Sequence, residues 1–248
     1  MNRHIKKILF VAFVTLQLTA SAQQVDIQKY SLKKFISKVA ILGGPSLLLP
    51  YEDSGYADSF RNDYNAQGIN ANFQIKDKFG TSAGLAAFHS LGKRWEIEGR
   101  LMYEKKGYIE ITEIDRPGDY RKTQYNFKNS YLTISLMPNV AIGSERRLFL
   151  YSGVLYNYLL HSMSVDTDYV NGLKTNLVTT QYTKSSGQKN KLNGSIIVGI
   201  GYPVTVSGKV ELCFYLQGNY GIGNIEEWKF LKMKSNSVSL LVGLKMKR

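Results

Sequence analysis

Charged side chains alternate with apolar ones in the segment from Trp95 to Tyr108. The charged positions are Glu96, Glu98, Arg100 and Glu104. Because successive side chains of a β-strand point to opposite faces, these charges lie on one face of a predicted strand. If that face is enclosed, the charges form a network of ion pairs, line a narrow path for ions or solutes, or include a buried carboxylate with a raised pKa. We expect Glu211 and Lys245 on the enclosed face as well, and we favour the paired network.

Residues typical of an enzyme or a metal site do not form a recognisable set in this sequence. After residue 22 there are two histidines, His89 and His161, which lie in separate predicted strands without the spacing of a metal motif. Asp166 and Asp168 lie in a polar segment that lacks the wider spacing of a calcium loop. No G-x-S-x-G motif marks a serine nucleophile. We therefore predict no catalytic residue, no metal site and no cofactor, and we interpret the histidines as structural or interfacial.

Glycine pairs and the single cysteine also have structural interpretations. Gly199-Ile-Gly201 and Gly221-Ile-Gly223 are not followed by a helix, so they are not phosphate-binding loops. Cys213 is the only cysteine, which excludes an intramolecular disulfide. We expect it to be a small residue of the core or wall.

The charged strand belongs to a predicted hairpin that runs from Phe79 to Tyr108, with a turn at Leu91-Gly92-Lys93. Six more strands are indicated by alternation or by apolar runs. They are Lys38–Leu49, Gln124–Ile142, Arg147–Ser162, Lys191–Pro203, Lys209–Asn219 and Asn236–Arg248. The strand that begins at Arg147 is apolar on both faces, so the pattern leaves its orientation open.

Short and long connections alternate along these eight strands. The short turns lie at Gly92, Gly143–Glu145 and Ser207-Gly208. The long polar connections are Pro50–Lys78, with extra strand near Ile69–Ile75, then Asp115–Arg121, Met163–Asn190 and Gly221–Ser235. In an up-and-down barrel this order places all short turns at one end, as in outer-membrane barrels with short periplasmic turns and longer external loops. We predict an all-β fold: an eight-stranded antiparallel up-and-down transmembrane β-barrel.

The N-terminus has the pattern of a secretory signal. Basic residues precede an apolar run from Ile8 to Leu18, and a small-residue cleavage site follows at Ala20-Ser21-Ala22. The apolar run is too short for a spanning helix. A lipoprotein would need a cysteine at the cleavage site, and none is near it. We predict a signal peptide at 1–22, a periplasmic lead-in at 23–37 and the barrel at 38–248.

Composition agrees with an exported β protein. The chain of 248 residues has 17 Tyr and 22 Gly against 5 Pro, and its formal charge is +13. A basic protein attracts anionic partners, and export argues against nucleic acid as that partner. Anionic lipopolysaccharide of the outer membrane is the partner we expect instead.

Two sets of residues favour a membrane barrel over a soluble one. Aromatic residues lie near strand ends, as in the aromatic girdles of outer-membrane barrels; they are Trp95, Tyr103, Tyr108, Tyr125, Tyr158 and Tyr220. Basic residues gather near the long connections as a possible collar, namely Lys105, Lys106, Arg121, Lys122, Lys189, Lys191, Lys229, Lys232 and Lys234. The chain also ends within its last strand, so the first and last strands can pair and close the barrel.

The hairpin and the final segment SVSLLVGLKMKR resemble the PorT-like outer-membrane β-barrel proteins of Bacteroidetes. In those proteins a strand rich in small residues leads through a short turn to an E-x-x-Y-x-x-K-G type of strand, and here that strand runs from Glu98 to Gly107. The chain departs from the commoner outer-membrane pattern by ending in Lys-Met-Lys-Arg rather than an aromatic residue. The resemblance implies location in the outer membrane and, for one branch, a link to secretion and gliding.

Four functions remain open from the sequence. The leading hypothesis is a monomeric barrel, inserted by the barrel assembly machinery, with a structural or loop-mediated binding role or a place in an envelope complex. A narrow pore or transport accessory is the second, and an outer-membrane enzyme is the third. The fourth is a soluble periplasmic barrel whose interior binds an apolar ligand.

Overall fold

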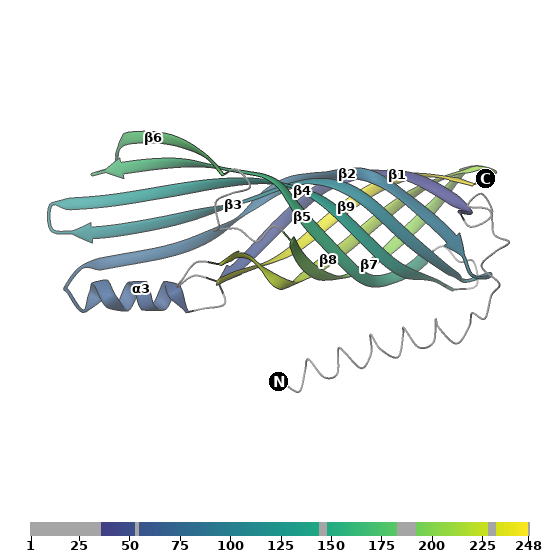
Figure 1. Ribbon diagram of the computed structural model, residues 1–248, viewed down its shortest axis with the longest axis horizontal. Coiled ribbons are helices and arrows are strands. Elements are labelled where there is room, and N and C mark those ends of the chain that lie inside the picture. The colour runs from purple at the N-terminus through teal and green to yellow at the C-terminus, as the bar shows by residue number, and fades with distance from the viewer. Residues whose placement is uncertain (1–35, 53–54, 144–147, 183–191, 228–231, 248) are drawn as a thin grey trace, which may run out of the picture. The chain divides into compact units, whose positions relative to one another are not determined.

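A computed structural model describes residues 36–52, 55–143, 148–182, 192–227 and 232–247 (Figure 1). The predicted signal peptide and all but the last two residues of the predicted lead-in lie outside these residues.

The described chain contains nine strands and one helix. In chain order they are β1 (Lys38–Glu52), α3 (Tyr56–Asn65), β2 (Asn70–Ser90), β3 (Trp95–Arg116), β4 (Asp119–Ile142), β5 (Leu148–Val170), β6 (Leu173–Tyr182), β7 (Leu192–Ser207), β8 (Val210–Glu227) and β9 (Lys232–Lys247). No helix in these ranges is long and apolar enough to cross a membrane.

Eight of the strands form a closed ring. The order is β4-β3-β2-β1-β9-β8-β7-β5, and β5 pairs back to β4. The first and last strands pair antiparallel, from Lys38 opposite Lys247 to Glu52 opposite Met233. Every other neighbouring pair is antiparallel too. The ninth strand, β6, pairs only with the far part of β5 and stands outside the ring. Eight antiparallel strands therefore close the barrel, and the predicted fold class is confirmed.

Apolar and charged residues lie on opposite faces of the barrel wall, as the alternation in the sequence predicted. On β3, Leu101 and Tyr103 are exposed on the outer face, whereas Glu98, Arg100 and Glu104 are buried on the inner face. On the other strands the exposed outer residues include Leu85, Ile134, Leu136, Val198, Leu216, Val238, Leu240, Val242 and Leu244. An apolar outer wall around a polar interior is the arrangement that lipid requires, since a closed ladder leaves no backbone group unpaired.

The inner face of β5, whose orientation was open, carries Phe149, Tyr151 and Leu155, while Leu150, Val154 and Tyr156 face outward. The inner aromatic rings fit because the neighbouring strand β7 has no side chains beneath them. A Cβ on Gly199 would lie 2.3 Å from Tyr151 Cζ, and one on Gly201 would lie 2.1 Å from Phe149 Cζ. The Gly-Ile-Gly sequence therefore provides room for aromatic packing.

Four strands continue well beyond the ring, and this differs from the prediction of long loops. β2, β3, β4 and β5 each have 21 to 24 residues. Together with β6 they form a sheet that leaves the barrel at the end opposite the short turns, with α3 beside it (Figure 1). We call this sheet and helix the extension.

Each predicted long loop of this region contains regular structure among its described residues, and the extra strand expected near Ile69–Ile75 is the first part of β2. The segment Pro50–Lys78 contains α3 and the first part of β2. The loop Asp115–Arg121 is a tight turn at Pro117-Gly118, where Gly118 has φ 80°. The segment Met163–Asn190 contains the end of β5 and all of β6, joined at Asn171-Gly172 with φ values of 50° and 80°. The outer part of β5 and all of β6 were interpreted as a loop, because apolar and polar residues do not alternate clearly in these strands.

Candidate functional site

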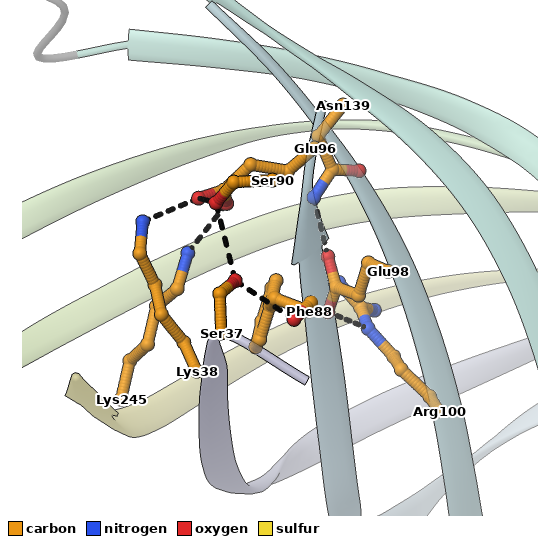
Figure 2. A network of polar contacts seen from close by, with 9 residues as sticks. All are labelled: Ser37, Lys38, Phe88, Ser90, Glu96, Glu98, Arg100, Asn139 and Lys245. Carbon is orange, nitrogen blue, oxygen red and sulfur yellow. Dashed lines mark hydrogen bonds and ion pairs between the residues drawn. The ribbon is translucent and has the colours of Figure 1, made fainter. Parts of the chain in front are cut away.

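The interior at the short-turn end contains two lysines that share one carboxylate (Figure 2). Lys38 Nζ forms an ion pair with Glu96 Oε1, and Lys245 Nζ lies 2.8 Å from Glu96 Oε2. The three side chains come from β1, β3 and β9, so the contacts tie together strands from both ends of the chain. The Lys245 ammonium also lies 3.8 Å from the ring centroid of Phe88. Glu211 on β8 lies opposite Lys245 and lines the same cavity, so a second carboxylate accompanies the two lysines.

Glu98 and Arg100 form a second ion pair deeper in the barrel (Figure 2). Arg100 Nε donates to Glu98 Oε1 at 2.6 Å, and both side chains are almost completely buried. The other Glu98 oxygen accepts from Asn139 Nδ2 at 2.8 Å, and an Arg100 terminal nitrogen donates to Gln217 Oε1 at 2.7 Å. A buried ion pair needs further hydrogen bonds to offset desolvation. These amides supply two of them, while the second terminal nitrogen of Arg100 is buried without a partner among the described residues.

The same guanidinium lies between two aromatic rings. Arg100 Cζ is 5.1 Å from the centroid of Tyr151 and 4.7 Å from that of Tyr215. Tyr215 contacts Phe149 edge to face, with centroids 5.5 Å apart. Aromatic faces attract cations, so the rings fill the middle of the barrel and compensate the buried charge.

A third group of charges lies nearer the extension. Lys106 Nζ is 2.6 Å from Glu104 Oε2, and Ser82 Oγ donates to Glu104 Oε1 at 3.2 Å. Thr133 Oγ1 lies 3.0 Å from Glu104 Oε2 and 2.7 Å from Asn157 Oδ1. The predicted paired network is thus present in three layers. Lys106 was predicted for an outer basic collar and is instead buried inside the barrel.

The extension end of the interior is covered by an aromatic cluster. Its buried members are Leu48, Phe73, Tyr108 and Phe127, and Tyr56, Ala57, Phe60, Ile75 and Tyr125 pack against them. Helix α3 contributes Tyr56, whose ring centroid is 5.2 Å from that of Phe73. Tyr108 and Tyr125 were predicted for an interfacial girdle and belong to this cluster instead. Trp95, Tyr103, Tyr158 and Tyr220 are exposed on the outer wall as expected.

The helix α3 was missed in the sequence, although Tyr56, Phe60 and Tyr64 recur at intervals of four residues and make one helical face. The other residues of the helix are mostly polar, so the segment was interpreted as a loop. The Asn171-Gly172 pair was likewise a recognisable hairpin signal, because both residues of such a turn need positive φ.

A cavity of about 620 Å³ opens at the short-turn end. Basic side chains of its lining are Lys38, Lys93, Arg94 and Lys245, and acidic ones are Glu96 and Glu211. Tyr202 and Phe149 also line it. This cavity is a vestibule that ends at the charged and aromatic layers described above.

Polar contacts also order the tip of the extension. Lys122 Nζ lies 2.9 Å from Glu113 Oε1, and Tyr120 donates its hydroxyl hydrogen to the same carboxylate at 3.2 Å. The hydrogen bond from Lys122 lowers the pKa of Glu113, and the reciprocal bond raises the pKa of Lys122.

The remaining candidate residues do not assemble into a site. His89 is on β2 opposite Ile97, and His161 is on β5 opposite Ser130. Asp166 accepts a hydrogen bond from Ser164 within β5, so it belongs to a strand and not to a loop. Among the described residues no group of His, Cys, Asp and Glu could hold a metal ion. Cys213 is buried in the barrel wall.

A closed barrel with an apolar outer wall and a charged, filled interior defines an outer-membrane protein. A family model described as "Outer membrane protein beta-barrel domain" matches residues 46–227, and the chain belongs to that family. No curated protein matches the sequence.

Solved outer-membrane barrels resemble the chain at low identity. Neisserial surface protein A is 13% identical, with 85% of this chain and 97% of that chain covered and a TM-score of 0.34. Ail, the attachment invasion locus protein of Yersinia pestis, is 9% identical, with 85% and 99% covered and a TM-score of 0.37. The outer membrane protease OmpT of Escherichia coli is 10% identical, with 89% and 99% covered and a TM-score of 0.42.

Proposed function

We propose that this protein is a non-catalytic outer-membrane barrel that binds a partner, or holds a place in an envelope complex, through its extension. The observation that carries the proposal is the extension itself. It is an ordered sheet with a helix packed on an aromatic cluster, and it stands outside the ring that closes the barrel. A protein that needed only to be anchored in lipid would not require strands of 21 to 24 residues.

The orientation follows from the asymmetry of the two ends. Few residues separate β2 from β3, β4 from β5 and β7 from β8, and these strand ends lie at one end of the ring. Outer-membrane barrels place short turns in the periplasm and longer structures outside. The extension therefore faces the exterior, and the vestibule faces the periplasm. The protein acts as a monomer delivered by the barrel assembly machinery, and the E-x-x-Y-x-x-K-G type of strand supports a place among PorT-like barrels.

The filled interior favours a binding role over a pore. The ion pair of Glu98 with Arg100, the rings of Tyr151 and Tyr215, and the cluster under α3 occupy successive layers. An eight-stranded barrel has an interior just wide enough for such side chains. Among the described residues of the layers and the extension, no group of His, Cys, Asp and Glu could hold a metal ion, and the proposal includes no reaction.

The test is a variant with a shorter extension and an unchanged barrel. Residues 113–116 and 119–122 are deleted in equal numbers from β3 and β4, so that Thr112 and Thr123 remain opposite each other across the Pro117-Gly118 turn. The aromatic cluster is retained. Heat-modifiable migration on a detergent gel shows that the barrel is folded.

The shortened protein replaces the native one in the producing organism. If the extension carries the function, this strain shows the same envelope defect as a complete deletion, although the barrel is present and folded. If the shortened protein restores the wild-type envelope, the outer part of the β3–β4 hairpin is dispensable, and the proposal fails for that part of the extension.

A further inference from the structure

Four lysines come together on the outer face of the wall, where the barrel passes into the extension. They are Lys76, Lys78, Lys105 and Lys128, and we call them the lysine patch. Lys128 lies opposite Gly107, and Lys76 lies opposite Ile109. Residues opposite each other in an antiparallel pair point to the same face, and so do residues two apart on one strand. Lys105, Gly107 and Ile109 therefore share the outer face with both partners.

Gly107 allows the fourth lysine to join the patch. A Cβ on Gly107 would lie 3.1 Å from Cδ of Lys78, so the Lys78 stem crosses the wall over this glycine. Its Nζ donates to Asn126 Oδ1 at 2.5 Å, and Asn126 lies opposite Ile109 on the outer face. With strands about 5 Å apart and a repeat of about 7 Å for every second residue, the four Cβ atoms lie within about 10 Å of Gly107.

The positive charge of the patch is not neutralised within the described chain. Lys76, Lys105 and Lys128 are exposed, and none of the four lysines forms an ion pair with any described residue. The nearby carboxylate of Glu104 points inward and is bonded to Lys106. The next carboxylate outward on the outer face of β3 is that of Glu113, which is bonded to Lys122.

The position of the patch identifies the kind of anion. Directly toward the barrel lie Leu101 and Tyr103, which are exposed, and Lys105 Nζ is 6.0 Å from the ring centroid of Tyr103. Phe79, next to Lys78, is 75% exposed. The surface is cationic on the side of the extension and apolar on the side of the barrel. It therefore complements an amphiphile with a phosphorylated headgroup and acyl chains. Lysine binds phosphate as a point charge, and the apolar wall holds the chains.

We propose that the lysine patch binds the phosphorylated headgroup of an outer-leaflet lipid of the lipopolysaccharide class. This rests on the orientation in the proposed function, which places the extension outside. The patch retains Lys105 of the predicted basic collar. Of the other collar residues, Lys106 is buried, Arg121 and Lys122 are paired with Asp119 and Glu113, and Lys189, Lys191 and Lys229 lie outside the described residues.

The test compares two triple variants with the same change in charge. Lys76→Gln, Lys105→Gln and Lys128→Gln remove the exposed part of the patch. The control variant carries Lys93→Gln, Arg94→Gln and Lys209→Gln, which are exposed residues at the short-turn end. Both proteins are purified and incorporated into phosphatidylcholine nanodiscs that contain bis-phosphorylated lipid A, and the lipid A that stays with the protein after detergent extraction is measured by native mass spectrometry.

The patch variant is expected to lose retention of lipid A by about tenfold to a hundredfold, since each lysine near an anionic surface contributes modestly and the three add. The control variant retains it as wild type does, dephosphorylated lipid A is retained poorly by all three proteins, and millimolar inorganic phosphate does not displace the lipid. Equal retention by the patch variant, or equal retention of dephosphorylated lipid A, overturns the proposal. Displacement by inorganic phosphate overturns the assignment to a lipid. The envelope test of the shortened extension is independent, because it leaves all four lysines in place.

Discussion

At the scale of single residues, the barrel interior is governed by the cost of burying charge. Glu98 and Arg100 are stable inside because each has a charged partner, amide hydrogen bonds and, for Arg100, two aromatic faces. Removing one member leaves the other charged and uncompensated, whereas removing both leaves only a packing defect.

This difference predicts the outcome of single and double substitutions. Glu98→Gln should destabilise the folded barrel by about 3–5 kcal/mol, because Arg100 then lacks its counterion. The double variant Glu98→Gln with Arg100→Met should be clearly more stable than the single variant. The measurement is the urea dependence of the gel-shifted, folded band in detergent. Equal stability of the single variant and wild type would mean that Glu98 is not the partner that stabilises Arg100.

The Glu113 carboxylate at the tip of the extension is predicted to titrate at lower pH than an ordinary glutamate. Its pKa is lowered because Lys122 and Tyr120 hydrogen-bond to the charged form. A lowered pKa in the folded state contributes stability above the ordinary value of about 4.3, and that contribution is lost as pH falls through the folded pKa. The raised pKa of Lys122 acts in the opposite range, and its contribution is lost only as pH rises above about 10.4.

Carboxyl NMR of Glu113 in detergent micelles checks this directly. Wild type should show a midpoint below that of glutamate in a short unstructured peptide, and Lys122→Gln should move it upward. A midpoint that does not change in Lys122→Gln would show that the ion pair does not form in solution.

At the scale of elements, the contact between β5 and β7 depends on glycine under aromatic rings. Gly199→Ala should destabilise the barrel by about 1–3 kcal/mol, because its Cβ would lie 2.3 Å from Tyr151 Cζ and 2.7 Å from the carbonyl oxygen of Leu216. Gly218→Ala in β8 is the matched control, since a Cβ there meets nothing within 4 Å. Thermal unfolding by gel shift compares the two. Similar losses in both variants would show that the cost comes from the strand backbone and not from the ring.

The sequence was informative about the barrel and much less so about the extension, for a physical reason. In β3 and β9 one face meets lipid, so apolar residues such as Leu101 and Leu244 alternate with interior residues and the pattern reveals the strand. The outer parts of β4, β5 and β6 are not selected for contact with lipid, and residues such as Thr123 and Thr167 carry no alternation. The interior contacts were predictable as a network, but not as pairs, because the partners of Arg100 and Lys245 depend on the register of strands that are distant in sequence.

At the scale of the whole molecule, ring closure and a filled interior together determine what the barrel can do. Closure pairs β1 with β9 along the whole wall, so the molecule should resist detergent until it is heated. Filling leaves the vestibule as an open space at one end, separated from the extension by the layer of Arg100, Tyr151 and Tyr215. A closed wall with blocked layers agrees with the binding role proposed above, and it is this blocking that a conductance measurement can check.

This separation predicts that wild-type protein in a planar lipid bilayer produces no stable ion conductance. Tyr151→Ala with Tyr215→Ala removes both rings that pack on Arg100, and this variant should show openings because water can then pass the middle layer. Tyr156→Ala with Tyr220→Ala is the matched control, because these tyrosines are exposed on the outer wall and their removal leaves the interior filled. Steady conductance in wild type, of the same size as in the interior variant, would show that the layer does not block the barrel and would favour a pore over a binding platform.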